Sequence, residues 1–543
     1  MIWLIQDFDL LSVLLRALAL SLEALTVGGV FFLLFVGTSL TAERAARNAV
    51  RGFVAWFALA LAITQVLAAA ESTVMLMSAS GPGLAFRDVI AASFFRANFI
   101  MAAGAVALFF LLRLRRGETW AACVLATAIL GGSVALSHAA SRIDHRPLLL
   151  LLTAAHHLGA AAWMGGMASL LVAIHRSEDA LKIHTLARRF SLMAIVSVSV
   201  LVLAGVGMTF LYVGSWSGMY GTSYGFMVLT KAYLLLLALT LGASNFWLVR
   251  RTQSDAAPVL LRLRRFSEAE IGLGFTAILA AASLTSQPPA IDLLRQDVLT
   301  GHEIVERMSL KQPELHSPSI ADLPPRKSLK EHLEDASFSG GSENDLMNQR
   351  WSEYNHQWSG LIVLSAGLLA LVSRFRGQRW ARNWPLLFFG LAVFLFLRAD
   401  PETWPLGARP FWASFAESDV LEHRLFVVLI TAFVVFEWAV ETGRLKAHQA
   451  ALVFPAICAL GGALLLTHSH GTGDLKGELY AEMSHSPIAL LGATAGWGRW
   501  LELRSPQDED VPDMGSRIVR IASWIWPICL VLIGLILLNY RES

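Results

Sequence analysis

The sequence predicts an all-α, polytopic membrane protein with about fourteen transmembrane helices. Of its 543 residues, 55% are hydrophobic and only 15% are charged, and the mean hydropathy is +0.56. Soluble domains carry about a quarter charged residues. Apolar runs of roughly 20 residues, the length that crosses a bilayer, recur along almost the whole chain. A net charge of +2 does not indicate a nucleic-acid or acidic partner.

The apolar runs divide into eight before a long polar segment and six after it. That segment, residues 288–350, contains SPSIADLPPRKS and SFSGGSEND, both rich in turn-forming residues. We therefore expect an eight-helix membrane domain at 1–290, an outer loop at 291–350 and a six-helix membrane domain at 351–543. The predicted spans cover residues 10–38, 52–78, 89–112, 119–140, 148–174, 190–214, 226–249, 266–287, 351–373, 383–398, 422–440, 448–468, 480–500 and 518–540.

Arginine and lysine in the short loops predict the orientation. Alternate loops are basic, among them 44–51, 113–116, 374–382 and 499–517, whereas the short loops between them are poor in both residues. Basic loops face the cytoplasm. With fourteen spans, all basic loops fall on one side, so both termini and the 291–350 loop are predicted to lie outside.

Histidines gather at the predicted outer ends of the spans. On the fifth span, AHHLGAAAWMGGM places His156, Trp163 and Met167 along one helical stripe. Imidazole and thioether groups together suit copper, particularly Cu(I). The alternative is a packing face, with Gly165 and Gly166 allowing close approach of another helix. The methionines alone favour packing, but an ionisable side chain within the membrane favours a functional role for His156.

His138 is the second candidate ligand in this half of the chain. It ends the fourth span, and a short outer turn, SRIDHRP, leads back toward His156. Because consecutive antiparallel helices are neighbours, we expect the two imidazoles to lie at similar depth.

Several motifs between residues 10 and 290 are similar to the bacterial copper resistance protein D (CopD) family. They include SHAA at 137–140, the spacing from His156 to Trp163 followed by Gly165 and Gly166, and three longer stretches. The stretches are RRFSLMAIVSVSVLVLAGVGMTFLYVGS, YGTSYGFMVLTKAYLLLLALTLGASNF and FSEAEIGLGFTAILAAASLTSQPPA. The resemblance implies copper handling at or across the bacterial inner membrane, with His138 and His156 at the positions of the family's histidines.

A faint internal repeat indicates an origin by duplication. LTVGG at 25–29 is similar to AWMGG at 162–166. His156 stands nine residues before Gly165, whereas Ala19 stands nine residues before Gly28. If both segments descend from one copy, only the second has kept the histidine.

A second metal site is predicted at the outer ends of the last six spans. EYNH and EMSH are two Glu-x-x-His motifs, and residues three apart share a helix face. The alternative is a rim of solvated polar residues, but two motifs with further histidines at one depth favour a site. A set rich in nitrogen prefers copper or zinc, and the HSHG pattern is similar to that of long CopD-type chains. The expected ligands are Glu353, His356, His423, His468, His470, Glu482 and His485.

Two classes of function remain open. The resemblance to the CopD family favours a copper transporter over an enzyme, one that receives copper ions from a periplasmic copper-binding donor protein. The alternative is a membrane oxidoreductase with haem b or a His/Glu di-metal centre at the outer face. The sequence has no phosphate-binding loop for a nucleotide and no C-x-x-C-H motif for covalent haem. Its three cysteines lie apart in apolar runs, which indicates buried small side chains.

Overall fold

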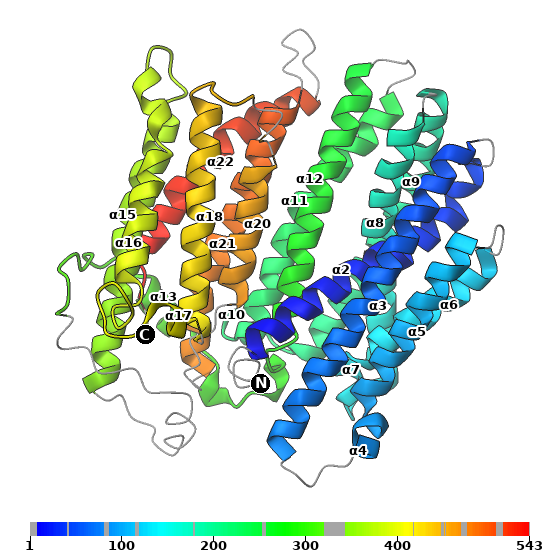
Figure 1. Cartoon of the computed structure of the whole chain (residues 1–543), viewed down its shortest axis with the longest axis horizontal. Coiled ribbons are helices and arrows are strands. Elements are labelled where there is room, and N and C mark those ends of the chain that lie inside the picture. Colours follow the sequence, from blue (N-terminus) through cyan, green and yellow to red (C-terminus); the bar gives the residue numbers. More distant parts are fainter. Residues whose placement is uncertain are drawn as a thin grey trace. The chain divides into compact units, whose positions relative to one another are not determined.

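The computed structural model is helical throughout the residues that it describes (Figure 1). Within these residues it contains no β-strand and one isolated bridge, between Thr403 and Arg409. An all-α architecture is therefore confirmed. The described residues are 8–40, 43–80, 86–114, 119–177, 180–251, 257–319, 343–415, 417–446, 450, 452–467, 475–505 and 514–541.

Each of the fourteen predicted spans coincides with a long helix of the structure. The first eight helices are α2 (Phe8–Phe35), α3 (Arg44–Ser80), α5 (Ser93–Leu114), α6 (Thr119–Ala135), α8 (Arg146–Arg176), α9 (Ala180–Tyr212), α11 (Ser223–Arg251) and α12 (Ala257–Leu284). The last six are α15 (Glu343–Val372), α16 (Leu386–Arg398), α18 (Ser418–Glu441), α20 (Val453–Thr467), α21 (Leu475–Arg504) and α22 (Met514–Leu538).

Most of these helices have the length and apolar composition of membrane spans. Eleven of the described helices meet both conditions, and shorter apolar helices lie at Trp120–Ala135 and Val453–Gly462. The remaining helix, α21, carries more charge, including Lys476, Glu482 and Arg499. The chain is a multi-pass membrane protein.

The described contacts divide the chain into two compact units. The first unit comprises residues 11–216 and 231–292, and the second comprises residues 1–10, 217–230 and 293–543. Residues 217–230 thus join the second unit, although they precede the polar segment in the sequence. The division at residues 290 and 350 stays a prediction.

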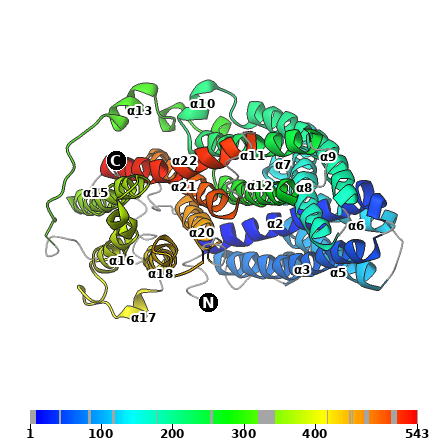
Figure 2. The same ribbon diagram turned by 90° about the horizontal axis from the view of Figure 1, so that it is seen from above.

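In the first unit, α8 is the central element, because it packs against α3, α6, α9 and α12. Helices α3 and α5 run side by side, as both views show (Figures 1 and 2). Gly28 of α2 and Gly165 of α8 face each other where these two helices cross. A Cβ on Gly28 would overlap the carbonyl oxygen of Ala161, and a Cβ on Gly165 would overlap that of Ala24. Only glycine permits this approach of the two backbones.

The second unit is built on two extensive helix pairs, α15 with α22 and α20 with α21. Glycines again permit close approach, since a Cβ on Gly367 would lie 2.7 Å from the backbone nitrogen of Val531. Aromatic side chains fill the core between these helices. They are Trp384, Phe388, Phe433, Phe454 and Trp526.

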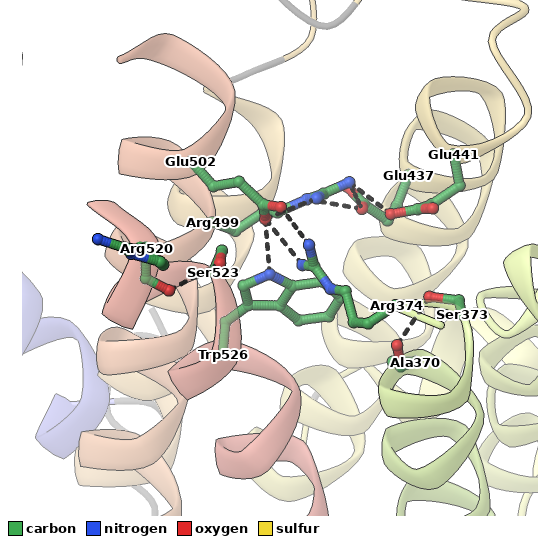
Figure 3. A network of polar contacts seen from close by, with 10 residues as sticks. All are labelled: Ala370, Ser373, Arg374, Glu437, Glu441, Arg499, Glu502, Arg520, Ser523 and Trp526. Atoms are coloured by element: carbon green, nitrogen blue, oxygen red, sulfur yellow. Dashed lines mark hydrogen bonds and ion pairs between the residues drawn. The ribbon is translucent and has the colours of Figure 1, made fainter. Parts of the chain in front are cut away.

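A network of buried charges joins four elements of the second unit (Figure 3). Arg499 of α21 donates to Glu437 and Glu441 of α18 at 2.7 and 2.6 Å, and to Glu502 at 2.8 Å. Arg374, which follows α15, forms a two-fold ion pair with Glu502. The indole nitrogen of Trp526 in α22 also donates to Glu502, at 2.8 Å. The side chains of Arg499 and Glu437 are only 5% and 4% exposed.

The polar segment after α12 is anchored to the second unit. A short helix, α13 (Gly301–Met308), begins with a capping box between Thr300 and Glu303. Glu303 also pairs with Lys476 of α21 at 2.9 Å. The hydrogen bond from Lys476 and those from Thr300 lower the pKa of Glu303 to about 2. This carboxylate therefore stays charged at any physiological pH and holds α13 beside the start of α21.

The predicted orientation can be tested with single cysteines in a variant that lacks Cys123, Cys458 and Cys529. His316, in the polar segment, and Gln378, in a basic loop, are both exposed. We expect His316→Cys to react with a membrane-impermeant thiol reagent in spheroplasts and Gln378→Cys to react only after lysis. Labelling of Gln378→Cys before lysis would show that the second unit has the opposite orientation to the predicted one.

Candidate metal sites

His138 lies just beyond the end of α6, at the start of the short helix α7 (His138–Ser141). Its imidazole hydrogen-bonds to the backbone of Thr285. The N–H of Thr285 already donates to the carbonyl oxygens of Ala281 and Ala282 at the end of α12. The Thr285 carbonyl therefore accepts from His138. The Nε2 atom of His138 is buried without a hydrogen-bond partner, so Nδ1 is the donor and Nε2 carries the lone pair.

The charge state of His138 also suits a ligand. Burial, together with the charge of Arg16, lowers the pKa of His138 from its ordinary value. The imidazole is therefore neutral at neutral pH, which is the form that binds a metal.

His156 has the same hydrogen-bond arrangement at a greater depth. It lies on α8, and its Nδ1 is 3.1 Å from the carbonyl oxygen of Leu201 in α9. A carbonyl can only accept, so Nδ1 donates and Nε2 of the neutral ring keeps its lone pair. The ring packs against Gly205, where a Cβ would lie 3.3 Å from His156 Cε1. Ser133 of α6 contacts His157, so His138, five residues further along the chain, lies nearer the end of the unit than His156.

The other members of the α8 stripe lie deeper in the helix packing. Met167 is 2% exposed and Trp163 is 5% exposed. The indole of Trp163 donates to a buried carboxylate, Glu270 of α12, at 3.0 Å. The structure therefore gives Trp163 a clear packing and hydrogen-bonding role, and ligation by Met167 stays a prediction.

Three residues of the first unit form a buried polar cluster that the ligand predictions do not contain. Ser133 of α6 donates to Glu23 of α2 at 2.6 Å and lies 3.1 Å from Nδ1 of His157. In the sequence, Glu23 is a single carboxylate within an apolar span. The sequence does not indicate a role for Ser133, because single serines are common in apolar helices.

In the second unit, His356 of α15 and His485 of α21 are neighbours, with ring centroids 5.9 Å apart. Tyr540, just after α22, stacks on His356 at 3.8 Å and lies 5.9 Å from the His485 ring. His356 donates from Nδ1 to the carbonyl oxygen of Ser352 at 2.8 Å. His485 is only 3% exposed. The sequence did not indicate Tyr540, because its neighbours mark it only as the end of an apolar run.

Three other predicted ligands of the second unit, Glu353, His423 and Glu482, lie on α15, α18 and α21. Glu353 accepts a hydrogen bond from Gln349 at 3.3 Å. His423 pairs through Nδ1 with Asp400 at 2.9 Å, an arrangement in which a carboxylate orients an imidazole. Glu482 precedes His485 by one turn of α21. His468 and His470 lie outside the described residues.

Among the described residues, no group of three or more His, Cys, Asp or Glu side chains is placed to hold a metal ion. Of the described candidates, His356 and His485 are neighbouring imidazoles, with ring centroids 5.9 Å apart. Four imidazoles hydrogen-bond through Nδ1, namely those of His156, His157, His356 and His423. In His138, Nε2 is the nitrogen without a hydrogen bond. In contrast, His184 donates through Nε2 to Val249.

Comparison with known proteins finds matches to part of the chain. Residues 184–284 match the family described as Copper resistance protein D. Over 152 residues, the chain is 28% identical to the copper transport protein CutJ of Bacillus subtilis, an alignment that covers 27% of each protein. The chain thus spans about a quarter of the length of this curated relative. No solved structure matches.

Proposed function

Because residues 184–284 place this chain in the copper resistance protein D family, we propose that it binds copper ions at histidines of its membrane helices. It passes the ions across or into the membrane after receiving them from a periplasmic copper-binding donor. The name of the relative, copper transport protein, supports transport as the class of activity.

The hydrogen bonding of His138 and His156 carries the proposal. Both imidazoles donate from Nδ1 to a backbone carbonyl, of Thr285 and Leu201 respectively. A histidine that ligates a metal usually donates its other ring N–H in this way, which fixes the ring and its tautomer. In His138 the remaining nitrogen is buried and without a hydrogen bond, which costs free energy unless a ligand occupies it. The residues therefore fit copper, and Met167 would add a soft ligand deeper in α8.

His138→Ala and His156→Ala test this route. Each variant removes one candidate ligand. We expect copper accumulation by cells that express the variant to fall at least about tenfold. Loss of a residue that only orients a metal ligand already lowers metal affinity 10–100-fold. Copper per cell, normalised to protein in the membrane, is the measurement.

His184→Ala is the matched control, because this imidazole donates through Nε2 to Val249 and so has the opposite tautomer. Met167→Leu keeps nearly the same volume and separates ligation from packing. Parental copper accumulation in both histidine variants at normal membrane levels would place the route elsewhere.

We further propose that the second unit holds a metal at the His356 and His485 pair. Nδ1 of His356 is held by the Ser352 carbonyl, which directs its Nε2 away from the backbone. The proposed additional ligands or orienting groups are His423, His468, His470, Glu353 and Glu482. The stacking of Tyr540 on His356 fixes the plane of that ring.

The double variant His356→Ala/His485→Ala should lose about one bound metal ion per chain, measured by elemental analysis of protein purified without added chelator. His302→Ala is the control, because this side chain is 88% exposed on α13. If the double variant keeps the metal content of the parent, the polar-rim explanation of these residues is correct.

A further inference from the structure

The Glu23–Ser133–His157 cluster lies inside the first unit, where α2, α6 and α8 contribute one side chain each. The side chain of Glu23 is 4% exposed. Ionisable groups at such positions in membrane helices are costly and usually functional. Neither the proposed route through His138 and His156 nor the packing of α8 requires this cluster.

The hydrogen bonds of the cluster have a fixed direction. Ser133 Oγ lies 2.6 Å from Glu23 Oε2. An ionised carboxylate can only accept, so the Ser133 hydroxyl donates its one proton to Glu23. Its oxygen, 3.1 Å from His157 Nδ1, must then accept from that nitrogen. The direction from imidazole to hydroxyl to carboxylate leaves the lone pair of a neutral His157 on Nε2.

We propose that His157 is a copper ligand through Nε2, and that Glu23 is its positioning residue, acting through the Ser133 hydroxyl. The arrangement resembles the carboxylate–histidine–metal contact common in metalloproteins, with a hydroxyl inserted between carboxylate and ring. This inference rests on the function proposed above and extends it by one ligand and one positioning residue.

The second oxygen of Glu23 adds an electrostatic contribution. Glu23 Oε1 is buried without a hydrogen bond, and it faces His157 Nδ1 at 3.7 Å. At this distance the carboxylate stabilises positive charge on the ring, which is the charge that the ring gains when Nε2 binds a metal ion. A buried carboxylate oxygen without a hydrogen bond is unusual in folded proteins, and helix packing alone does not explain it.

His157 and its neighbour His156 present ligand nitrogens on two faces of α8. His156 contacts α9 through Leu201, whereas His157 contacts α6 through Ser133. Adjacent residues differ by about 100° around a helix. A copper ion bound to one of these imidazoles therefore has a second imidazole on the adjacent residue, and different contacts orient the two rings.

The test combines nitrogen NMR with copper titration of the purified full-length protein. Imidazole nitrogen-15 shifts distinguish the Nδ1–H tautomer, the Nε2–H tautomer and the imidazolium. His157→Gln identifies the resonance. We expect the parent protein to show the Nδ1–H tautomer at His157. In His157→Gln, Cu(I) titration against a competing chelator should show one strong site fewer, or binding at least about tenfold weaker.

Glu23→Gln is the diagnostic variant. A glutamine amide can donate to Ser133, which lets the hydroxyl donate to His157 and moves the ring proton to Nε2. We expect that tautomer change, with copper binding weakened about 10–100-fold. Ser133→Ala, which removes the connection, should weaken copper binding similarly, and it serves as the second variant if Glu23→Gln is poorly folded.

Thr26→Val is the matched control, because Thr26 is a buried hydroxyl of α2 one turn from Glu23 and makes no hydrogen bond through its Oγ1. It should leave both the tautomer and the copper affinity unchanged. An imidazolium at His157 in the parent, or parental copper affinity in both His157→Gln and Glu23→Gln, would overturn the inference while leaving the proposed function intact. A parent that binds no copper would overturn both.

Discussion

Arg499→Ala should destabilise the protein more than any other single change to a charged residue of the second unit. The guanidinium donates to Glu437, Glu441 and Glu502, and its side chain is 5% exposed. Removing one partner of a buried ion pair leaves an uncompensated charge and costs about 3–5 kcal/mol. Here two carboxylates of α18 would lose the cation that holds them together. We expect a large drop in the midpoint of thermal unfolding in detergent, measured as the fraction of monodisperse protein after heating.

Arg444→Ala provides the comparison for Arg499→Ala. Arg444 stacks on Trp438 but is exposed, so its loss should change the midpoint little. Arg499→Lys should resemble the alanine variant more than the parent, because a single ammonium lacks the planar set of donors that contacts three carboxylates. An unchanged midpoint in Arg499→Ala would show that the network contributes nothing to stability.

Gly28→Ala and Gly165→Ala are expected to be the most damaging changes in the first unit. Each added methyl would overlap a backbone carbonyl of the facing helix, Ala161 or Ala24, which cannot rotate away. Overpacking costs about 1–3 kcal/mol where side chains can adjust and more where they cannot. We expect each variant to lose at least about 3 kcal/mol, seen as low yield and early thermal aggregation.

Gly131→Ala is the control for both glycines, since a Cβ on this residue of α6 would meet nothing within 4 Å. It should be neutral or slightly stabilising, because alanine favours the helix by about 1 kcal/mol over glycine. If Gly165→Ala is as stable as Gly131→Ala, the backbones of α2 and α8 cannot be in contact.

The sequence predicted the fold well because the dominant signal, apolar length, is local. All fourteen predicted spans coincide with helices, including α21, whose charges lie among apolar residues. The same local signal does not reveal ion pairing. Arg374 follows α15, in a predicted basic loop, whereas Arg499 lies within α21, and both side chains belong to the ion-pair network. Charge along a chain does not show whether a partner from another helix is present.

The candidate sites were predictable only as residue types, for a related reason. Helical spacing placed His156 and Met167 on one stripe, but the stripe did not show which nitrogen of His156 is the donor. That depends on Leu201, 45 residues away in the sequence. Ser133 and Tyr540 escaped notice because hydroxyl groups are common in membrane helices and at their ends. Their significance comes from what they contact, Glu23 and His356.

The crossing of α2 and α8 has a consequence for the ancestry of the chain. Gly28 and Gly165 occupy the same place in the repeated LTVGG and AWMGG segments. Each approaches the carbonyl that lies four residues before the other, Ala24 or Ala161, so the contact is reciprocal. Such reciprocity is the mark of two-fold symmetry, in which one surface meets its own copy. A reciprocal contact of this kind is what the predicted duplication would produce if the two copies pack against each other within one polypeptide. Two copies within one polypeptide can change independently, which two identical subunits cannot do, so a histidine at position 156 is compatible with an alanine at position 19.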